Sequence, residues 1–471
     1  MSVTALEWFE EVPVHWEVRR LRTVLRKVAE RNRPDLPLLS VVRDKGVVLR
    51  DLTDQSGNHN YIPDDLSHYK VVRKGQFAIN KMKAWQGSYG VSQWDGIVSP
   101  AYHVYAVKGV VGRYFHLAIR SRACVPCFSA ASDGVRVGQW DLSAPRMREI
   151  PFLIPPCPEQ AAIVRFLEAA DRRIRRYIRA KERLIELLEE RKRALIHEAV
   201  TGRIDVRTGQ PYPAYKDSGV AWLPAIPNHW VRCRLRNVVS EVTTGSRGWS
   251  SYAADGGPLF VRVANLSRGS LELRLEDAVR LNLPVTSEAA RTRIAEGDLL
   301  LSVTAYIGSV GVAPEGLGEA YVSQHVARCR PSPAVASKWL GYVLLSSLGQ
   351  TYGQTRLYGG TKDGLSLDDV RNYPILLPSR GEQRELVRWI ERRLSLLGKL
   401  RDATHRQIAL LQEYRTRLIA DAVTGKLDVR EAATKLPETD PLAADPDRAD
   451  PIPTESNLHS TAHDMMKEAS A

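Results

Sequence analysis

One long charged segment occurs twice in this sequence, and its two copies align without a gap. Residues 158–207 return as residues 381–430. Glu159-Gln160 aligns with Glu382-Gln383, and Ala199-Val-Thr-Gly202 aligns with Ala422-Val-Thr-Gly425. Because each copy of a repeat must form the same structural unit, this feature limits the fold more than any other. We expect a chain built from two related halves.

Each copy has the pattern of one long helix. Apolar residues three or four positions apart form a single seam, and no proline interrupts it. Gly202 and Gly425 stand where a helix stop is expected. A helix of roughly 40 residues extends about 60 Å, and a lone seam needs a partner, so we expect an antiparallel pair of spacers. The alternative is two helices that pack only on their own domains. The seam residues expected to face a partner helix are Leu167, Ile174, Leu184, Leu188, Leu195, Leu394, Leu397, Ile408, Leu411 and Leu418.

The repeat extends beyond the helices. Each half opens with a W-x-x-x-[VI]-P-x-H-W motif, at Trp8 and again at Trp222. His15 and His229 within it stand beside Pro and Trp, which favours packing over catalysis. Glycine landmarks also recur: residues 75–80 correspond to 297–302, residues 87–90 to 308–311, and Asp133-Gly134 to Asp363-Gly364.

Short apolar runs broken by Gly, Pro and Asp predict strands between these motifs. The runs are Gln76 to Asn80, Gly96 to Val107, Leu259 to Val263, Leu299 to Val303 and Tyr321 to Cys329. We therefore expect an α+β protein with two mixed α/β domains and two long antiparallel helices, related by a pseudo-two-fold internal repeat. The expected divisions are a first domain (1–157), a central spacer helix (158–207), a second domain (208–377), a C-terminal spacer helix (378–430) and a disordered acidic tail (431–471).

Charge is unevenly distributed along the chain. The formal net charge is +13, but residues 431–471 hold nine acidic and three basic residues, which leaves +19 for the body. A basic body favours a polyanionic partner, most simply nucleic acid. The amino terminus lacks the pattern of a signal peptide, and the least charged stretch, Leu299 to Ala313, is too short to cross a bilayer. We expect a cytoplasmic protein that is not associated with a membrane.

Motifs that carry catalysis or bind metals were not found. The Cys124-Val-Pro-Cys127 pair has no second pair, so two buried thiols are a better interpretation than zinc. Gly359 to Gly364 lacks the spacing of a phosphate-binding loop, and His197-Glu198 lacks the second histidine of a zinc protease. Neither a nucleophile elbow nor a Gly-rich cofactor fingerprint occurs. We expect no catalytic residue and no metal ligand.

Taken together, the repeated Glu-Gln start of a long helix and its Ala-Val-Thr-Gly end resemble the specificity subunit of type I restriction-modification systems. The resemblance covers roughly residues 6 to 430. Asp363 to Asp369, ahead of Pro378, is similar to the family's closing pattern, whereas the first half departs from it at Asp133.

This resemblance implies two target-recognition domains, each of which reads one half of a bipartite, asymmetric DNA sequence. It implies that the helices set the gap between the half-sites and dock two methyltransferase subunits, and that restriction/translocase subunits join the complex. Methyl transfer to adenine, with S-adenosylmethionine, then belongs to the partners, as do ATP and Mg. The chain itself is expected to bind double-stranded DNA, to hold no cofactor and to catalyse nothing.

Base reading requires polar side chains on loops that reach a groove, with basic side chains on phosphates. An alternative for Trp85 and Tyr306 is that they are core aromatics, and for the lysines that they form a solvated face. Arg172 to Arg176 on the first helix are either solvated, in contact with partners, or near phosphates. The candidates are Lys81, Lys83, Trp85, Gln86, Ser88 and Tyr89 in the first half, and Thr304, Tyr306 and Ser309 in the second, with Ser246, Arg247, Tyr358, Thr361 and Lys362 as outer candidates.

Two other classes of function compete with this interpretation. A stand-alone methyltransferase or nuclease would need a cofactor or metal motif. A coiled-coil scaffold without sequence-specific DNA binding would lack the salt-dependent retention on DNA that phosphate neutralisation demands.

Overall fold

The computed structural model divides the chain into two compact units. The first unit comprises residues 1–180 and 407–471, and the second comprises residues 181–406. The structure describes residue 9 and residues 12–51, 62–134, 140–276, 278–284, 286–357 and 364–437. Among these residues, no helix is both long enough and apolar enough to cross a membrane.

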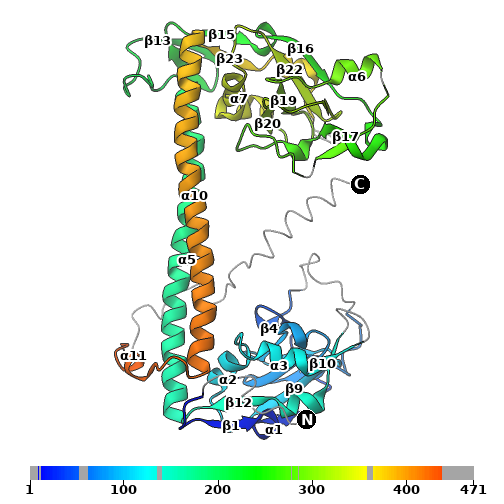
Figure 1. Ribbon diagram of the computed structural model, residues 1–471, viewed down its shortest axis with the longest axis vertical. Coiled ribbons are helices and arrows are strands. Elements are labelled where there is room, and N and C mark those ends of the chain that lie inside the picture. Colours follow the sequence, from blue (N-terminus) through cyan, green and yellow to red (C-terminus); the bar gives the residue numbers. More distant parts are fainter. Residues whose placement is uncertain are drawn as a thin grey trace. The chain divides into compact units, whose positions relative to one another are not determined.

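The first unit holds a mixed α/β domain and parts of both long helices (Figure 1). Its elements are β1 (Glu17–Arg20), α1 (Leu21–Val24), β2 (Leu25–Lys27), β3 (Leu39–Val42), β4 (Gly46–Leu49), β5 (Lys70–Val72), β6 (Gln76–Asn80), η2 (Ala84–Gln86), β7 (Tyr89–Val91), β8 (Gly96–Val98), β9 (Tyr102–Val107), α2 (Gly112–Ile119), α3 (Val125–Ala130), β10 (Ser132–Asp133), β11 (Asp141–Leu142), α4 (Ala144–Glu149), β12 (Pro151–Ile154) and α11 (Arg430–Thr434). Helix α5 (Cys157–Val200) starts here, and helix α10 (Arg380–Val423) ends here.

The second unit repeats this plan with longer connections. Its elements are β13 (Tyr215–Val220), β14 (Leu223–Pro227), β15 (Val231–Arg234), η3 (Leu235–Asn237), β16 (Val239–Thr244), η4 (Trp249–Tyr252), β17 (Ala253–Val261), η5 (Val263–Asn265), β18 (Val279–Leu281), α6 (Ser287–Thr292), β19 (Leu299–Ser302), β20 (Val310–Val312), β21 (Ala320–Val322), β22 (Val326–Pro331), α7 (Ser337–Leu345), α8 (Ser347–Thr355), α9 (Leu367–Arg371) and β23 (Pro374–Leu377). The predicted strand from Tyr321 to Cys329 is therefore wrong as one element, because β21 and β22 are separate strands. The run from Gly96 to Val107 likewise forms two strands, β8 and β9.

Both units contain a four-stranded antiparallel sheet with the same register. The strand order is β2-β9-β6-β7 in the first unit and β16-β22-β19-β20 in the second. On the central strand β6, Phe77 lies opposite Tyr105 and Val91. On β19, Leu299 lies opposite Cys329 and Val312 in the same way. The predicted correspondence of residues 75–80 with 297–302, and of 87–90 with 308–311, is confirmed by this register.

One predicted correspondence is wrong. Asp133 lies in the hairpin β10–β11, opposite Asp141, and Asp363 lies outside the described residues. The hydrogen bonds match Leu142 instead with Leu365: the Leu142 N–H donates to the Lys81 carbonyl at 3.0 Å, and the Leu365 N–H donates to the Val303 carbonyl at 2.7 Å. The mismatch arose because an Asp-Gly dipeptide is a common turn signal and therefore weak for alignment.

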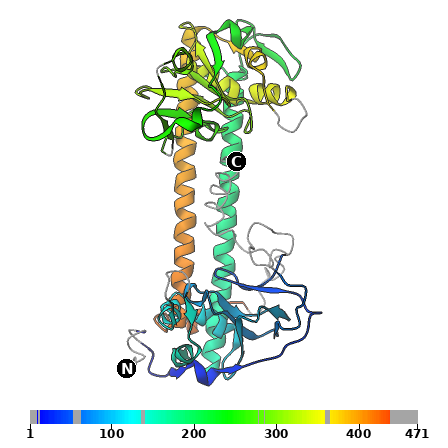
Figure 2. The same ribbon diagram turned by 90° about the vertical axis from the view of Figure 1, so that its right-hand side faces the viewer.

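The long helices pair antiparallel within each unit (Figures 1 and 2). In the first unit, Asp171 on α5 forms an ion pair with Arg415 on α10. In the second, Glu189 on α5 lies 3.6 Å from Arg401 on α10. The ten predicted seam residues are all buried or half-buried. Some of these side chains also belong to the domain cores: Leu167 and Leu418 lie in the core of the first unit, and Leu195 lies in that of the second.

The repeated opening motif holds the first turn of each helix. In the first unit, the Glu159 carboxylate lies 2.8 Å from His15 Nε2 and accepts a hydrogen bond from Trp16 Nε1 at 3.1 Å. The strand β1 that follows pairs with β12, the last strand before α5. His15 therefore contributes a polar contact to the first turn of α5, although its side chain is exposed and is not part of the core.

The equivalent glutamate in the second unit, Glu382, has one donor more. It accepts from Tyr212 Oη at 2.6 Å and from Trp230 Nε1 at 3.0 Å, and His229 Nε2 lies 3.0 Å away. Gln383, the next residue, accepts from the Ala336 N–H at 3.0 Å and donates to the Pro378 carbonyl at 2.9 Å. The repeated Glu-Gln pair thus ties each helix to its own domain.

The helices stop at glycines that dock on the same opening motifs. Gly202 and Gly425 have φ angles of +70° and +80°, which favour glycine. A Cβ on Gly202 would lie 2.3 Å from Pro227, and one on Gly425 would lie 2.4 Å from Pro13. Each helix end is therefore fixed by close backbone approach as well as by conformation.

The predicted tail starts too early. Residues 430–434 form α11, and Val429 and Ala433 are buried against the first unit. Arg165 of α5 donates a hydrogen bond to the Leu436 carbonyl. Residues 438–471 lie outside the described residues.

Candidate nucleic-acid interface

The candidate loops follow the central strand of each sheet. In the first unit the loop joins β6 to β7, and its base is held by the Leu142–Lys81 hydrogen bond. In the second unit the loop joins β19 to β20, with the Leu365–Val303 bond at the same place. Both loops are thus fixed at one edge by the segment that leads to the last strand of the domain. Their tips carry the side chains predicted to read bases.

In the first unit, the structure separates the predicted residues into exposed and buried groups. Lys83 is exposed, whereas Lys81 is half-buried and pairs with Asp141 at 2.7 Å. Trp85 and Gln86 are half-buried, and the Trp85 ring lies 5.4 Å from that of Trp140. These four side chains remain candidates for contact with a ligand.

Ser88 and Tyr89, the other two predicted residues of this loop, are buried. Their exposed fractions are 1% and 0%, so the prediction that they contact DNA is wrong for the structure as it stands. Tyr89 starts β7, and its ring stacks on Phe128 with a centroid distance of 4.2 Å. The sequence misled because a polar pair between two glycines resembles an exposed loop, whereas here Tyr89 already belongs to β7 and Ser88 directly precedes it.

The second unit shows the same division. Tyr306 is 46% exposed, and Thr304 is half-buried with its hydroxyl 2.8 Å from His325 Nδ1. Ser309 is only 3% exposed and donates to the Tyr306 carbonyl at 2.8 Å, so its predicted contact with DNA is also wrong. Tyr306 is therefore not a core aromatic, and it projects from a loop in which Ala305 has a φ of +54°. Strained non-glycine residues of this kind concentrate at functional sites.

The outer candidates follow β16 in the second unit. Arg247 is exposed, and half-buried Ser246 donates a hydrogen bond to Glu288 of α6. Gly245 precedes them and lies so close to β21 that a Cβ there would be 1.9 Å from the Val322 carbonyl oxygen. Tyr358, Thr361 and Lys362 lie outside the described residues.

A basic cluster in the first unit was missed by the sequence analysis. Lys27, Arg31, Lys70 and Lys81 come from β2, the following bridge, β5 and the position directly after β6. Burial, and then the charges of Arg31, Lys27 and Lys81, hold the pKa of Lys70 below its usual value. Among the described residues only Lys81 of these four pairs with a carboxylate. An uncompensated group of like charges favours a polyanionic ligand. No sequence signal could reveal it, because the four residues meet only through strand pairing.

His103 on β9 lies beside this basic cluster. Burial lowers its pKa below the usual value, and the neighbouring Lys70 and Lys27 lower it further. At neutral pH the imidazole is therefore uncharged, and it adds hydrogen-bonding capacity rather than charge to this face.

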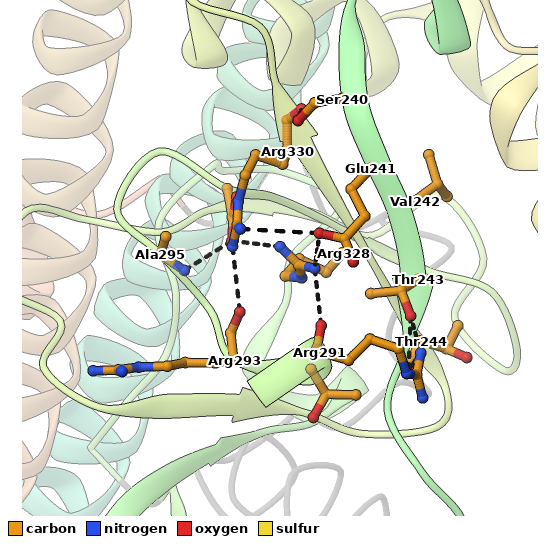
Figure 3. A network of polar contacts seen from close by, with 12 residues as sticks. Ser240, Glu241, Val242, Thr243, Thr244, Arg291, Arg293, Ala295, Arg328 and Arg330 are labelled. Atoms are coloured by element: carbon orange, nitrogen blue, oxygen red, sulfur yellow. Dashed lines mark hydrogen bonds and ion pairs between the residues drawn. The ribbon is translucent and has the colours of Figure 1, made fainter. Parts of the chain in front are cut away.

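A buried ionic network supports the outer candidates in the second unit (Figure 3). Arg328 on β22 and Asp298 before β19 are each 1% exposed and lie 3.3 Å apart. Glu241 on β16 lies 2.6 Å from Arg328, and Arg330 lies 2.9 Å from Asp298. Charges this deep are stable only when paired. The network therefore fixes β16 and β22 against one another.

The same network reaches the loop that carries α6. Arg328 donates to the Arg291 carbonyl at 2.9 Å, and the Ala295 N–H donates to Asp298 at 2.8 Å. The Arg291 side chain in turn donates to the Thr243 hydroxyl and to the Thr244 carbonyl, at the end of β16 (Figure 3). The end of β16, which leads to Ser246 and Arg247, is thus fixed by Arg328 through Glu241 and by Arg291 through Thr243 and Thr244.

The arginines near Tyr177 on α5 contact neighbouring side chains of the same helix, and the two cysteines of the Cys-x-x-Cys pair are buried. On α5, Arg173 and Arg176 lie over the Tyr177 ring, and Arg175 pairs with Asp171. Cys124 and Cys127 are buried as predicted, and burial raises the pKa of their thiols to about 11 and about 12. In the part of the chain that the structure describes, no group of three His, Cys, Asp or Glu residues is arranged to hold a metal ion.

Comparisons with known proteins agree on one family. Residues 283–403, from just before α6 into α10, match the family model of the type I restriction modification DNA specificity domain. The chain is 23% identical over 292 residues to the type I restriction enzyme EcoBI specificity subunit of Escherichia coli. That alignment covers 61% of this chain and 60% of the relative, which is less than two thirds of the relative's length.

Solved structures show the same fold. One chain, from a study of complex assembly and conformational transition of the type I R-M system, superposes with a TM-score of 0.65 at 20% identity. The match covers 88% of this chain and all of that one. The HsdS subunit from Thermoanaerobacter tengcongensis has a TM-score of 0.51 at 19% identity, covering 88% and 98% of the two chains.

Proposed function

We propose that this chain is a specificity subunit of a type I restriction-modification system, as its similarity to that family supports, and that it recognises a bipartite, asymmetric DNA sequence. Each of its two domains reads one half of the target. The observation that carries this proposal is the repeat of one sheet, with one register, that presents two loops of different composition. Related frameworks with unlike side chains suit half-sites that differ in sequence.

In this proposal, the residues of the two loops have different roles in recognition. Lys83, Trp85 and Gln86 supply charge, stacking and an amide in the first domain, while Thr304 and Tyr306 supply hydroxyl groups in the second. Amides and hydroxyls can read base edges, whereas lysines chiefly neutralise phosphates. The basic cluster around Lys70 adds a further phosphate-binding face to the first domain.

We further propose that the chain supplies specificity and its partners supply chemistry. Two methyltransferase subunits, with S-adenosylmethionine, would dock on the paired helices, and restriction/translocase subunits would bring ATP and Mg. Large apolar side chains exposed on the helices support this docking in each unit: Tyr177, Leu410 and Tyr414 in the first, and Leu187, Leu396 and Leu400 in the second. Leu187 and Leu410 are equivalent in the repeat, as are Tyr177 and Leu400. Equivalent apolar positions suit two copies of one partner.

The helices are also proposed to act as a spacer between the half-sites. Each spans 44 residues without a break. Their paired, uninterrupted helical backbone is suited to setting a fixed number of unread base pairs.

The direct test is sequencing of methylated adenines in cells that express this chain with its neighbouring methyltransferase subunit. A new bipartite methylated motif that disappears when this chain is deleted is the expected result. Methylation that is unaffected by the deletion, while the methyltransferase is active, would contradict the proposal and favour the scaffold alternative.

Neutralising one member of the basic cluster is expected to weaken binding to all DNA sequences alike. Lys27→Ala removes an exposed charge and should reduce the slope of log affinity against log salt concentration by about one. Titrations of the full chain with duplex DNA at several salt concentrations measure this slope. Lys108→Ala, at the far end of the neighbouring strand β9, removes an equal charge outside the basic cluster and is the matched control. If the two variants have equal salt slopes, the basic cluster does not contact DNA phosphates.

A further inference from the structure

Each candidate loop contains a glycine at positive φ, and its carbonyl accepts a hydrogen bond from a side chain at or directly after a neighbouring helix. Gly87 and Gly308 are equivalent in the repeat and have φ angles of +94° and +89°. The Gly87 carbonyl accepts a hydrogen bond from Arg120 Nη1 at 3.3 Å. The Gly308 carbonyl accepts one from Gln350 Nε2 at 2.9 Å. The two units therefore hold the same point of the loop with different chemistry.

Arg120 follows α2 and donates to four backbone carbonyls. Beside Gly87 it donates to Tyr89, and its other nitrogen donates to Arg43 at 2.8 Å and to Asp44 at 2.9 Å. The last two residues form the turn between β3 and β4, so one guanidinium joins this turn to the candidate loop. Its fork of fixed donors is suited to such a bridge.

Gln350 lies on α8 and donates to the Leu344 carbonyl at 3.0 Å as well as to Gly308. A Cβ on Gly308 would lie 2.1 Å from the Gln350 amide oxygen, so the amide is packed directly on the glycine. The same loop contains Ala305 at positive φ, and the Ile307 N–H lies 2.5 Å from the Ala305 carbonyl. A strained loop of this kind keeps its shape only when its surroundings fix it.

We propose that Arg120 and Gln350 are positioning residues that set the base preference of their own half-sites without contacting DNA. This inference rests on the proposed function. Bidentate readout of a base requires side chains to be placed within a fraction of an ångström. Release of the glycine carbonyl lets the loop relax and shifts Tyr306, or Lys83 and Gln86, relative to the groove.

Gln350→Glu tests the second domain. The change keeps the shape of the side chain but replaces its donor with an acceptor that faces two carbonyls. Gln354→Glu makes the same change one turn later on α8, where the side chain is exposed, and is the matched control. The full chain is bound to DNA libraries randomised in one half-site at a time. We expect Gln350→Glu to lower discrimination at the second half-site by about tenfold and to leave the first half-site and the control unchanged.

A second pair of variants covers the first domain and guards against misfolding. Arg120→Lys, compared with exposed Arg122→Lys, should lower discrimination at the first half-site alone. Gln350→Met, which removes the donor without adding charge, should act in the same direction as Gln350→Glu.

Three outcomes would overturn the inference. The first is unchanged base preference in the Arg120 and Gln350 variants when the wild-type chain does select a bipartite sequence. The second is an equal loss at both half-sites, which would indicate a global loss of stability. A wild-type chain that selects no sequence would instead refute the proposed function, and the positioning role with it.

Discussion

Replacing Asp298 with alanine is expected to destabilise the second unit by about 3 kcal/mol. The change leaves Arg328, which is 1% exposed, without one of its two carboxylates. Loss of one partner from a buried ion pair costs about 3–5 kcal/mol. The lower value applies here because Glu241 still lies 2.6 Å from the guanidinium. Hydrogen exchange of the amides of β19 and β22 in the full chain measures the loss, since a chain of two units does not unfold in one step.

Two variants separate this ionic effect from general disturbance. Glu296→Ala removes an exposed carboxylate two residues away and should change stability by less than about 0.5 kcal/mol. Asp298→Asn combined with Arg328→Met should recover much of the loss, because uncharged residues of similar size then replace the buried charges. The first unit has Gln76 and Val104 at the equivalent positions, so this framework tolerates an uncharged pair. If the double variant is less stable than Asp298→Ala, burial of the charge is not the source of the effect.

Replacing Glu382 with alanine is expected to destabilise the junction of α10 with its domain by about 2–4 kcal/mol. Two buried donors, Tyr212 Oη and Trp230 Nε1, lose their acceptor. Each unpaired buried donor costs about 1–3 kcal/mol. Faster exchange of the amides in β23 and in the first turns of α10 would report the loss.

The first unit provides the control for this prediction. Glu159→Ala unpairs a single buried donor, Trp16 Nε1, because His15 is 46% exposed and water can replace its partner. We expect a loss of about 1–2 kcal/mol there. Glu382→Gln retains an acceptor and should restore part of the stability. Equal losses in the two alanine variants would show that the number of buried donors does not determine the effect.

The parts of the structure that were predicted from sequence are those set by local periodicity or by repetition. The seam from Leu167 to Leu195 predicted α5, and Gly202 marked its end, because both signals lie within one element. The correspondence of Gly87 with Gly308 located two equivalent loops before any contact was known. Both glycines are needed at positive φ, which explains why they persist in the two halves while the residues before them differ.

The features that escaped prediction depend on which strands pair. Lys27 on β2 and Lys70 on β5 are far apart in sequence, and the backbone bridge between Arg31 and Lys70 brings β5 beside the segment that follows β2. Arg328 reads as an exposed charge at a strand, but its burial is possible because Asp298, just before β19, and Glu241 on β16 pair with it. Ser88, Tyr89 and Ser309 were predicted to lie on exposed loops, whereas they are buried in or beside strands. Their polar character alone could not distinguish these environments.

The composition of the first unit also bears on how the chain folds during synthesis. The second unit is continuous, from residue 181 to residue 406, whereas the first needs residues from both ends of the chain. Its core joins Phe9 and Trp16 to Leu418, Ala422 and Val429. Although the first unit begins at the amino terminus, it therefore completes its core only after the ribosome has released the end of α10. Until then its apolar surface is exposed, which is a general cause of dependence on chaperones.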